Sequence, residues 1–134
     1  MATRNRDQRT ELHRAANEGD AAAVKALLAA GHDPNSQDSQ GWSPLHFGAQ
    51  ASSAAVVETL LAAGARVDPC DLNGNTPLLR AVFNSQGDGS VIFLLRAAGA
   101  DPLVENCSGM SPVSLARSIA NYDVRQFFVD IAEG

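Results

Sequence analysis

Two histidines, His13 and His46, carry the side chain best suited to acid–base chemistry at neutral pH, and they lie 33 residues apart. Catalysis would also need a nucleophilic Ser or Cys beside a base, with an acid to orient that base. No Ser or Cys stands with a His and an acid at a spacing typical of such sites. His32 follows a glycine in a stretch typical of a solvated loop. The sequence therefore predicts no catalytic residue.

Metal ions and phosphate cofactors would need other side chains, which the sequence does not group together. Cys70 and Cys107 each lack a second Cys or His at ligand spacing, which argues against zinc and against a disulfide framework. There is no G-x-x-x-x-G-K-[ST] loop, and Lys25 is the single lysine. The segment 86–89 (QGDG) has one Asp, which suits a solvated turn better than a calcium site. We predict no metal, no cofactor and no enzymatic activity. An unrecognised enzyme or ligand site, the alternative, would show a deep pocket lined by titratable groups with shifted pKa values.

The elements that must position any functional residue are expected to be helical. The chain has 134 residues, the size of one domain, with 45% hydrophobic but only 5% aromatic residues. Ala contributes 23 residues and is the best helix former, whereas a β-sandwich or barrel would need more β-branched and aromatic residues.

The charge is unevenly distributed. The net charge of −5 divides into +2 over residues 1–14 and −7 over residues 15–134. This acidic balance argues against nucleic-acid binding, and the basic start predicts a flexible segment over residues 1–9. No apolar run is long enough to span a membrane, and residues 1–10 lack the apolar stretch of a signal peptide. With two isolated cysteines, these features predict a cytoplasmic protein that does not contact membranes.

Internal repeats organise the chain. Three independent markers recur with the same spacings of 33 and then 35 residues. The markers are a glycine after an apolar run (Gly31, Gly64, Gly99), a glycine two residues before a Ser or Thr (Gly41, Gly74, Gly109), and a Ser/Thr-Pro pair (Ser43-Pro44, Thr76-Pro77, Ser111-Pro112). The probability that three markers share one register by chance is very small, so the sequence predicts a repeat array.

Each unit predicts a pair of short helices. Ser43 is an N-cap residue, and the proline after it suits the first helical position, where its missing N–H is not needed. First helices are predicted over 44–50 and 77–83, and a second helix over 54–63, with apolar residues on one face. Gly64 suits a left-handed helix end, and residues 65–71 form a turn-rich connection to the next unit.

These units resemble the ankyrin repeat family. The pattern D-x-x-G-x-[ST]-P-L-H-x-A followed by V-x-x-L-L-x-x-G-A-D is matched by residues 38–49 with 57–67 and by 71–82 with 92–102. The resemblance covers about residues 10–131. It implies an all-α solenoid of four helix-turn-helix repeats joined by short turns or β-hairpin loops. We place one domain over 1–134, with repeats at about 10–36, 37–69, 70–103 and 104–134.

The outer units depart from the pattern as capping units would. Thr10-Glu11 replaces Thr-Pro at the start, and residues 121–133 are expected to form a polar and aromatic closing helix, so the stack resembles a complete protein. In the later repeats Leu79 and Ser114 replace the motif His, and Arg96 replaces an apolar residue of the second helix. The segment 86–89 carries the two-residue insertion of the third unit.

The resemblance also implies roles for residues. His13 and His46 should bond to loop backbone and tie adjacent repeats together. Protein partners should bind the turn tips and the inner side of each first helix, which together form a concave face. The positions mapped to partner binding are Gln40, Trp42, Gln50, Leu72, Asn73, Asn75, Phe83, Asn84, Met110 and Ser118.

Trp42, the single Trp, is the most informative of these residues. Exposed aromatic residues are typical binding anchors, and Leu72, Phe83 and Met110 should extend an apolar strip across three repeats. The alternative is that Trp42 packs onto the neighbouring turn. If Trp42 is an anchor, Trp42→Ala should lower partner affinity with little damage to the fold.

The predicted function is non-catalytic binding of another protein, by masking or tethering it. The acidic repeat body favours a partner with a basic surface, and a monomer is favoured over a homo-oligomer. Nine Arg to one Lys suggests a GC-rich, often bacterial genome. A bacterial toxin-immunity protein is therefore one specific hypothesis, and a structural or homo-oligomeric module is the alternative.

Overall fold

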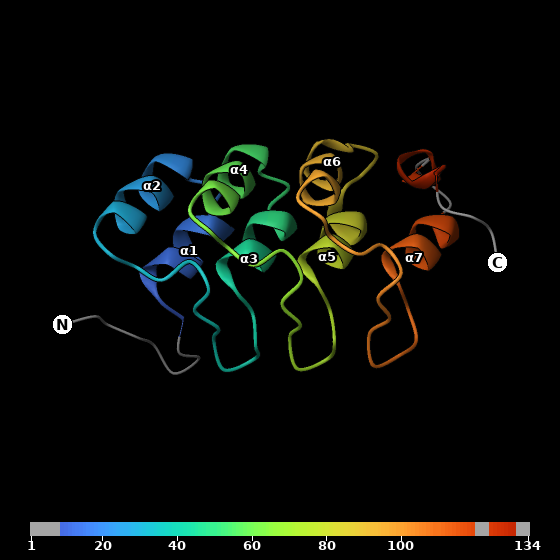
Figure 1. The fold of residues 1–134 in the computed structure, drawn as a ribbon, viewed down its shortest axis with the longest axis horizontal. Coiled ribbons are helices and arrows are strands. Elements are labelled where there is room, and N and C mark those ends of the chain that lie inside the picture. Colours follow the sequence, from blue (N-terminus) through green and yellow to red (C-terminus); the bar gives the residue numbers. More distant parts are fainter. Residues whose placement is uncertain (1–8, 120–123, 131–134) are drawn as a thin grey trace.

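The computed structural model describes residues 9–119 and 124–130, which form helices arranged in two parallel rows (Figure 1). The first row contains α1 (Glu11–Asn17), α3 (Pro44–Gln50), α5 (Pro77–Asn84) and α7 (Pro112–Ser118). The second row contains α2 (Ala21–Ala29), α4 (Ala54–Ala62) and α6 (Ser90–Ala97), and the 3₁₀-helix η1 (Val124–Phe128) follows α7. No strand occurs within the described ranges, so the all-α class predicted from the sequence is confirmed.

The repeated Ser/Thr-Pro pairs start the first helices as predicted. The hydroxyl of Ser43 accepts a hydrogen bond from the backbone N–H of His46 (3.3 Å), and Thr76 caps α5 in the same way through Leu79 N–H (3.3 Å). The helix predicted over 44–50 has the observed bounds, and the one predicted over 77–83 extends to Asn84. Local capping therefore determines where these helices begin.

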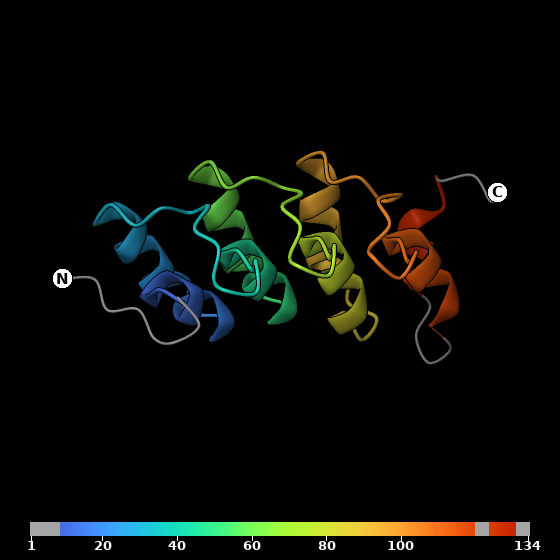
Figure 2. The same ribbon diagram turned by 90° about the horizontal axis from the view of Figure 1, so that it is seen from below.

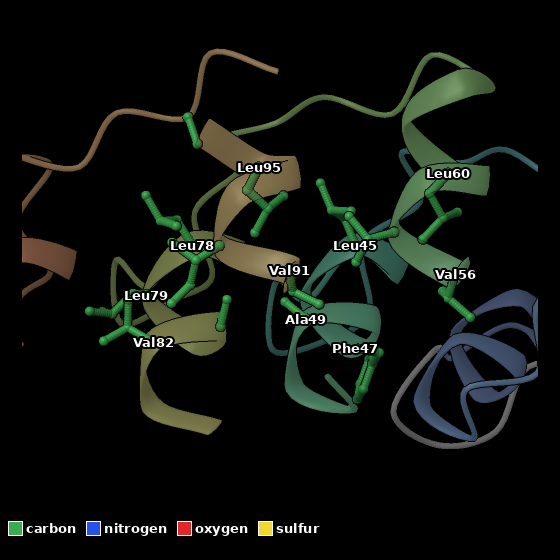
Figure 3. Packing of buried hydrophobic residues seen from close by; sticks show 14 of the residues in the cluster. Leu45, Phe47, Ala49, Val56, Leu60, Leu78, Leu79, Val82, Val91 and Leu95 are labelled. Carbon is green, nitrogen blue, oxygen red and sulfur yellow. The ribbon is translucent and has the colours of Figure 1, made fainter. Parts of the chain in front are cut away.

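The core lies between the two rows of helices, where side chains from neighbouring repeats interdigitate (Figure 3). Leu45, Leu60 and Leu78 are fully buried there. Gly48 allows the close approach of α3 and α4, because a Cβ atom at this position would lie 2.9 Å from Val56 Cγ1. A larger residue at position 48 would push the two helices apart.

The loops that join the repeats project from the first row of helices, away from the second row, and their tips lie side by side (Figures 1 and 2). In each tip one side-chain oxygen accepts two backbone N–H groups; the residues that do so are Asp38, Asp71 and Asn106. Adjacent tips are hydrogen-bonded, because Leu72 N–H donates to Gln40 O (3.0 Å) and Cys107 N–H donates to Asn73 O (2.9 Å).

Glycine is required at two tips. Gly41 and Gly74 have φ values of +81° and +76°, and a Cβ atom at either would come within about 3 Å of the next tip's backbone. Asp38 N–H donates to Trp42 O (2.9 Å), which closes the tip as in a hairpin. The predicted hairpin loops therefore have hairpin closure without forming strands in the part of the chain that the structure describes.

The C-terminal end differs from the predicted closing helix over 121–133. Residues 120–123 and 131–134 lie outside the described residues, as do residues 1–8 of the predicted basic segment. Between them the chain forms η1 and then a turn at Val129 and Asp130. Arg96 donates to Phe127 O (2.9 Å), a carbonyl that a continuing α-helix would use, and it pairs with Asp130 (2.6 Å). Of the closing helix predicted over 121–133, the described residues form a 3₁₀-helix over Val124–Phe128, and the prediction is wrong at the turn of Val129 and Asp130.

Candidate protein-binding surface

The histidines tie repeats together, as the family resemblance implies. The Nε2–H of His13 donates to Trp42 O (2.9 Å), and that of His46 donates to Asn75 O (2.7 Å) in the next tip. Nδ1 of His46 accepts the backbone N–H of Ser43 (3.0 Å), which fixes the neutral tautomer. Burial lowers the pKa of both imidazoles, so both remain neutral at pH 7. These fully occupied rings are structural.

One open hollow is lined by titratable groups. It lies on the second connecting loop, and its lining residues include Arg66, Asp68 and Cys70. Burial raises the pKa of the Asp68 carboxyl and of the Cys70 thiol, and Asp68 and Asp71 raise the thiol pKa further. A raised thiol pKa lowers the thiolate population, so Cys70 is a poor nucleophile. No group of three or more metal-ligating side chains occurs among the residues that the structure describes.

The predicted binding residues fall on two kinds of element. Gln40, Leu72, Asn73 and Met110 are exposed on the tips, and Phe83 and Ser118 are exposed near the ends of α5 and α7; Gln50 and Asn84 are half-buried at the ends of α3 and α5. We call the surface formed by the tips and the first-row helices the inner-helix face.

Asn75 has a structural role that the sequence did not reveal. Its side chain donates to Asp71 Oδ2 (3.3 Å) and accepts a hydrogen bond from Asn106 (2.9 Å), while its backbone oxygen accepts from His46. These bonds occupy the side chain within the row of tips. Asn75 therefore stabilises the inner-helix face more than it offers groups to a partner.

The apolar strip is uneven. Leu72 is 68% exposed and Phe83 62%, whereas Met110 is 38% exposed. Trp42 is half-buried and packs on Phe47, with ring centroids 4.7 Å apart, and on His46 at 5.6 Å. Much of the Trp42 side chain is therefore used in packing within the protein. The large exposed apolar side chains of the predicted strip are Leu72 and Phe83.

Arg80 was missed in the sequence, although it lies on α5 three residues before Phe83. Its guanidinium carbon lies 5.0 Å from the ring centroid of Trp42 and 5.2 Å from that of Phe83. Nη2 donates to Gln50 Oε1 (2.6 Å). Burial lowers the pKa of Arg80 against a smaller raising effect of Asp71, but the side chain stays cationic at neutral pH. The signal in the sequence that could have identified it is a single Arg among the apolar residues of α5, the first helix of the third repeat.

Comparison with known families agrees with this architecture. A family model described as ankyrin repeats, with three copies, matches residues 12–106. The chain therefore belongs to the ankyrin repeat family. No curated protein matches the chain significantly. The predicted fourth repeat, 104–134, lies almost entirely beyond the matched residues, although α7 begins with the same Ser-Pro cap.

Membership of this family suggests a protein-binding module. Ankyrin repeats are typically non-catalytic, and the match identifies no catalytic domain. Within residues 9–119 and 124–130, every helix is too short or too polar to cross a bilayer.

Proposed function

We propose that the chain binds a partner protein through the inner-helix face and covers part of that partner's surface. The observation that carries the proposal is the exposure of two large apolar side chains, Leu72 (68%) and Phe83 (62%), on the same repeat. The scaffold beneath them is fixed by hydrogen bonds between adjacent tips. A rigid surface loses little conformational entropy on binding, so its apolar anchors contribute more fully to affinity.

A partner with a basic surface is supported by the acidic net charge of −5, which acts at long range. Exposed carboxylates occur around the second row of helices and the connecting loops; they are Asp20, Asp33, Glu58, Asp88, Asp101, Glu105 and Asp130. Such a field attracts a basic protein over about one Debye length, roughly 8 Å at physiological salt. Association should therefore slow as the salt concentration rises.

Masking is the simplest consequence of binding, because the part of the partner that contacts the inner-helix face is no longer accessible to other molecules. A toxin-immunity protein from a bacterium is the specific case that we propose for testing, with a basic toxin as the masked partner. A monomer that binds a different protein is preferred to a homo-oligomer. The molecular mass in solution separates these two, since the homo-oligomer would close its own apolar strip.

The matched pair Phe83→Ser and Phe93→Ser tests the proposal. Phe93 is 67% exposed, like Phe83, but it lies on α6 in the second row. With the partner isolated by co-purification from the native cell, calorimetry should show that Phe83→Ser weakens binding by about tenfold or more. Phe93→Ser should change the affinity by less than about twofold. The reverse pattern would place the binding surface on the second row.

A further inference from the structure

The half-buried guanidinium of Arg80 has hydrogen-bond donors that the described residues leave unused. Its Nε atom is buried without a hydrogen-bond acceptor, and Nη2 has Gln50 as its acceptor. Across residues 9–119 and 124–130, no carboxylate lies within ion-pair distance of Arg80. The nearby Asp71 is buried, and its two oxygens accept hydrogen bonds from the tip's own backbone and from Asn75. A partly desolvated cation with unmet donors favours an acceptor supplied from outside.

Arg96 shows how the same chain satisfies a comparable guanidinium. Its two terminal nitrogens donate to both carboxylate oxygens of Asp130 at 2.7 and 2.6 Å. This bond raises the pKa of Arg96, whereas burial lowers that of Arg80. Both side chains also lie over an aromatic ring. The two sites therefore differ in whether a carboxylate is present.

The surroundings of Arg80 hold the guanidinium in one place. Trp42 and Phe83 lie at 5.0 and 5.2 Å from it, and Gln50 binds Nη2. These contacts come from three elements: the first tip, α3 and α5. Because the rotamer is already restricted, a ligand loses less side-chain entropy there than at a solvated arginine.

We propose that Arg80, held between Trp42 and Phe83, receives the carboxylate of an Asp or Glu side chain of the partner protein. An apolar residue beside that carboxylate covers Phe83. This inference rests on the proposed function and names the chemistry of its central contact. A single guanidinium balances one negative charge, whereas phosphorylated peptides are recognised by clusters of arginines. A lone acidic anchor is compatible with a basic partner, because steering acts at long range and the anchor acts at contact.

Peptides selected from a random library displayed on phage provide the probe. The library is selected on the full chain, and selected peptides are synthesised and titrated. Trp42 is the single Trp, so its fluorescence reports occupancy beside Arg80 directly. Selected sequences should share an Asp or Glu next to an apolar residue. Selection of sequences without an acidic residue, or of peptides that need a phosphate, would overturn the proposal.

Two arginine variants and one peptide substitution then test the contact. Arg80→Gln should weaken binding by about tenfold or more, the usual effect of losing a charged hydrogen bond. Arg66→Gln, just after α4 of the second row, changes the net charge equally at an exposed position outside the inner-helix face and should have less than about a twofold effect. Replacing the peptide's Glu by Gln should weaken binding to the native chain but not to Arg80→Gln. Equal losses in both backgrounds would overturn the contact.

Leu72→Ser separates this proposal from the proposed function. Leu72 is an exposed tip residue that contributes to the inner-helix face without lining the Arg80 site. If Leu72→Ser weakens peptide binding while Arg80→Gln does not, the face binds peptides and the carboxylate contact is wrong. If neither variant changes the affinity, both proposals are wrong. Thermal unfolding of each variant confirms that the fold is retained.

Discussion

The first two connecting loops and the third are built on the same repeat register but are held differently. His13 and His46 donate to carbonyls of the first and second loops, at 2.9 and 2.7 Å. At the equivalent place in the next repeat stands Leu79, a buried side chain that cannot donate. The third loop therefore keeps its own turn hydrogen bonds but lacks the side-chain tie to the helix before it.

The lateral bonds between loops show the same contrast. Asn35 donates to Gly64 O (3.3 Å) and accepts from Arg66 N–H (2.7 Å), so both ends of its amide are used. Asp68 lies 33 residues later and accepts from Asp101 N–H (3.0 Å), but its Oδ1 is buried without a partner. A carboxylate has no donor for the position that the Asn35 NH₂ occupies. These two residues, at equivalent positions in adjacent loops, therefore differ in how completely their side chains are hydrogen-bonded.

Placing at position 46 the residue type found at the equivalent position 79 should have the largest effect on stability. His46→Leu reproduces Leu79 and should destabilise the protein by about 2–3 kcal/mol, because Ser43 N–H and Asn75 O lose their partner. Urea unfolding measures this change. The control is Leu79→Met, a swap of similar volume that should cost less than about 1.5 kcal/mol. A cost below about 0.5 kcal/mol for His46→Leu would show that the tie contributes little.

Trp42→Ala should come next, and here the structure changes the expectation of little damage. Trp42 packs on Phe47 and against Arg80, so its loss should cost about 1–2 kcal/mol, less than for a fully buried aromatic residue. Thermal or urea unfolding tests this cost. If Trp42→Ala leaves the free energy of unfolding unchanged, the packing of Trp42 contributes little to stability and only the binding-anchor role is left.

Asp68→Asn should sharpen the comparison in the opposite direction. This substitution introduces the side-chain amide that Asn35 has at the equivalent position. Its NH₂ group can donate a hydrogen bond where the Asp68 Oδ1 has no partner, and the change should stabilise the protein by about 1 kcal/mol at pH 7. Denaturant unfolding measures the gain. Asn35→Asp is the reciprocal variant and should lose stability. Destabilisation by Asp68→Asn would contradict the equivalence of the two loops.

The dependence of stability on pH should separate the same two regions. The pKa of His13 and His46 is lowered on folding, so the unfolded chain binds more protons, and their contribution is lost as pH falls below about 6.5. The pKa of Asp68 is raised on folding, so its effect has the opposite sign: stability rises as pH falls through the raised value. Unfolding curves measured between pH 7 and pH 4 should therefore show that His46→Leu loses less stability on acidification than the native chain does. Asp68→Asn should remove the opposing contribution, and an unchanged pH profile in both variants would contradict these assignments.

Sequence reasoning predicted the helices well because their signals are local. Ser43-Pro44 and Thr76-Pro77 predicted the starts of α3 and α5, and the 33-residue register placed the equivalent tips. The closing helix over 121–133 was wrong at the described turn. Its course there depends on the distant Arg96, which takes Phe127 O and pairs with Asp130.

The candidate site was predicted less completely. The tips and helix ends were placed correctly, and Leu72 and Phe83 are exposed as an apolar strip requires. Arg80 was overlooked because its significance comes from Trp42 and Gln50, residues of the preceding repeat. The identity of the partner and the basic character of its surface stay predictions.

The sequence by itself determined the ankyrin register, the helix starts and the glycine turns, because capping and backbone conformation depend on a few neighbouring residues. Only the tertiary structure decided that Trp42 lies half-buried, that Asp68 has an unpartnered oxygen and that Arg80 has no carboxylate within ion-pair distance in residues 9–119 and 124–130. Each of these results depends on contacts about one repeat away. Burial and polar satisfaction are properties of the assembled stack, and a repeat unit taken alone does not contain them.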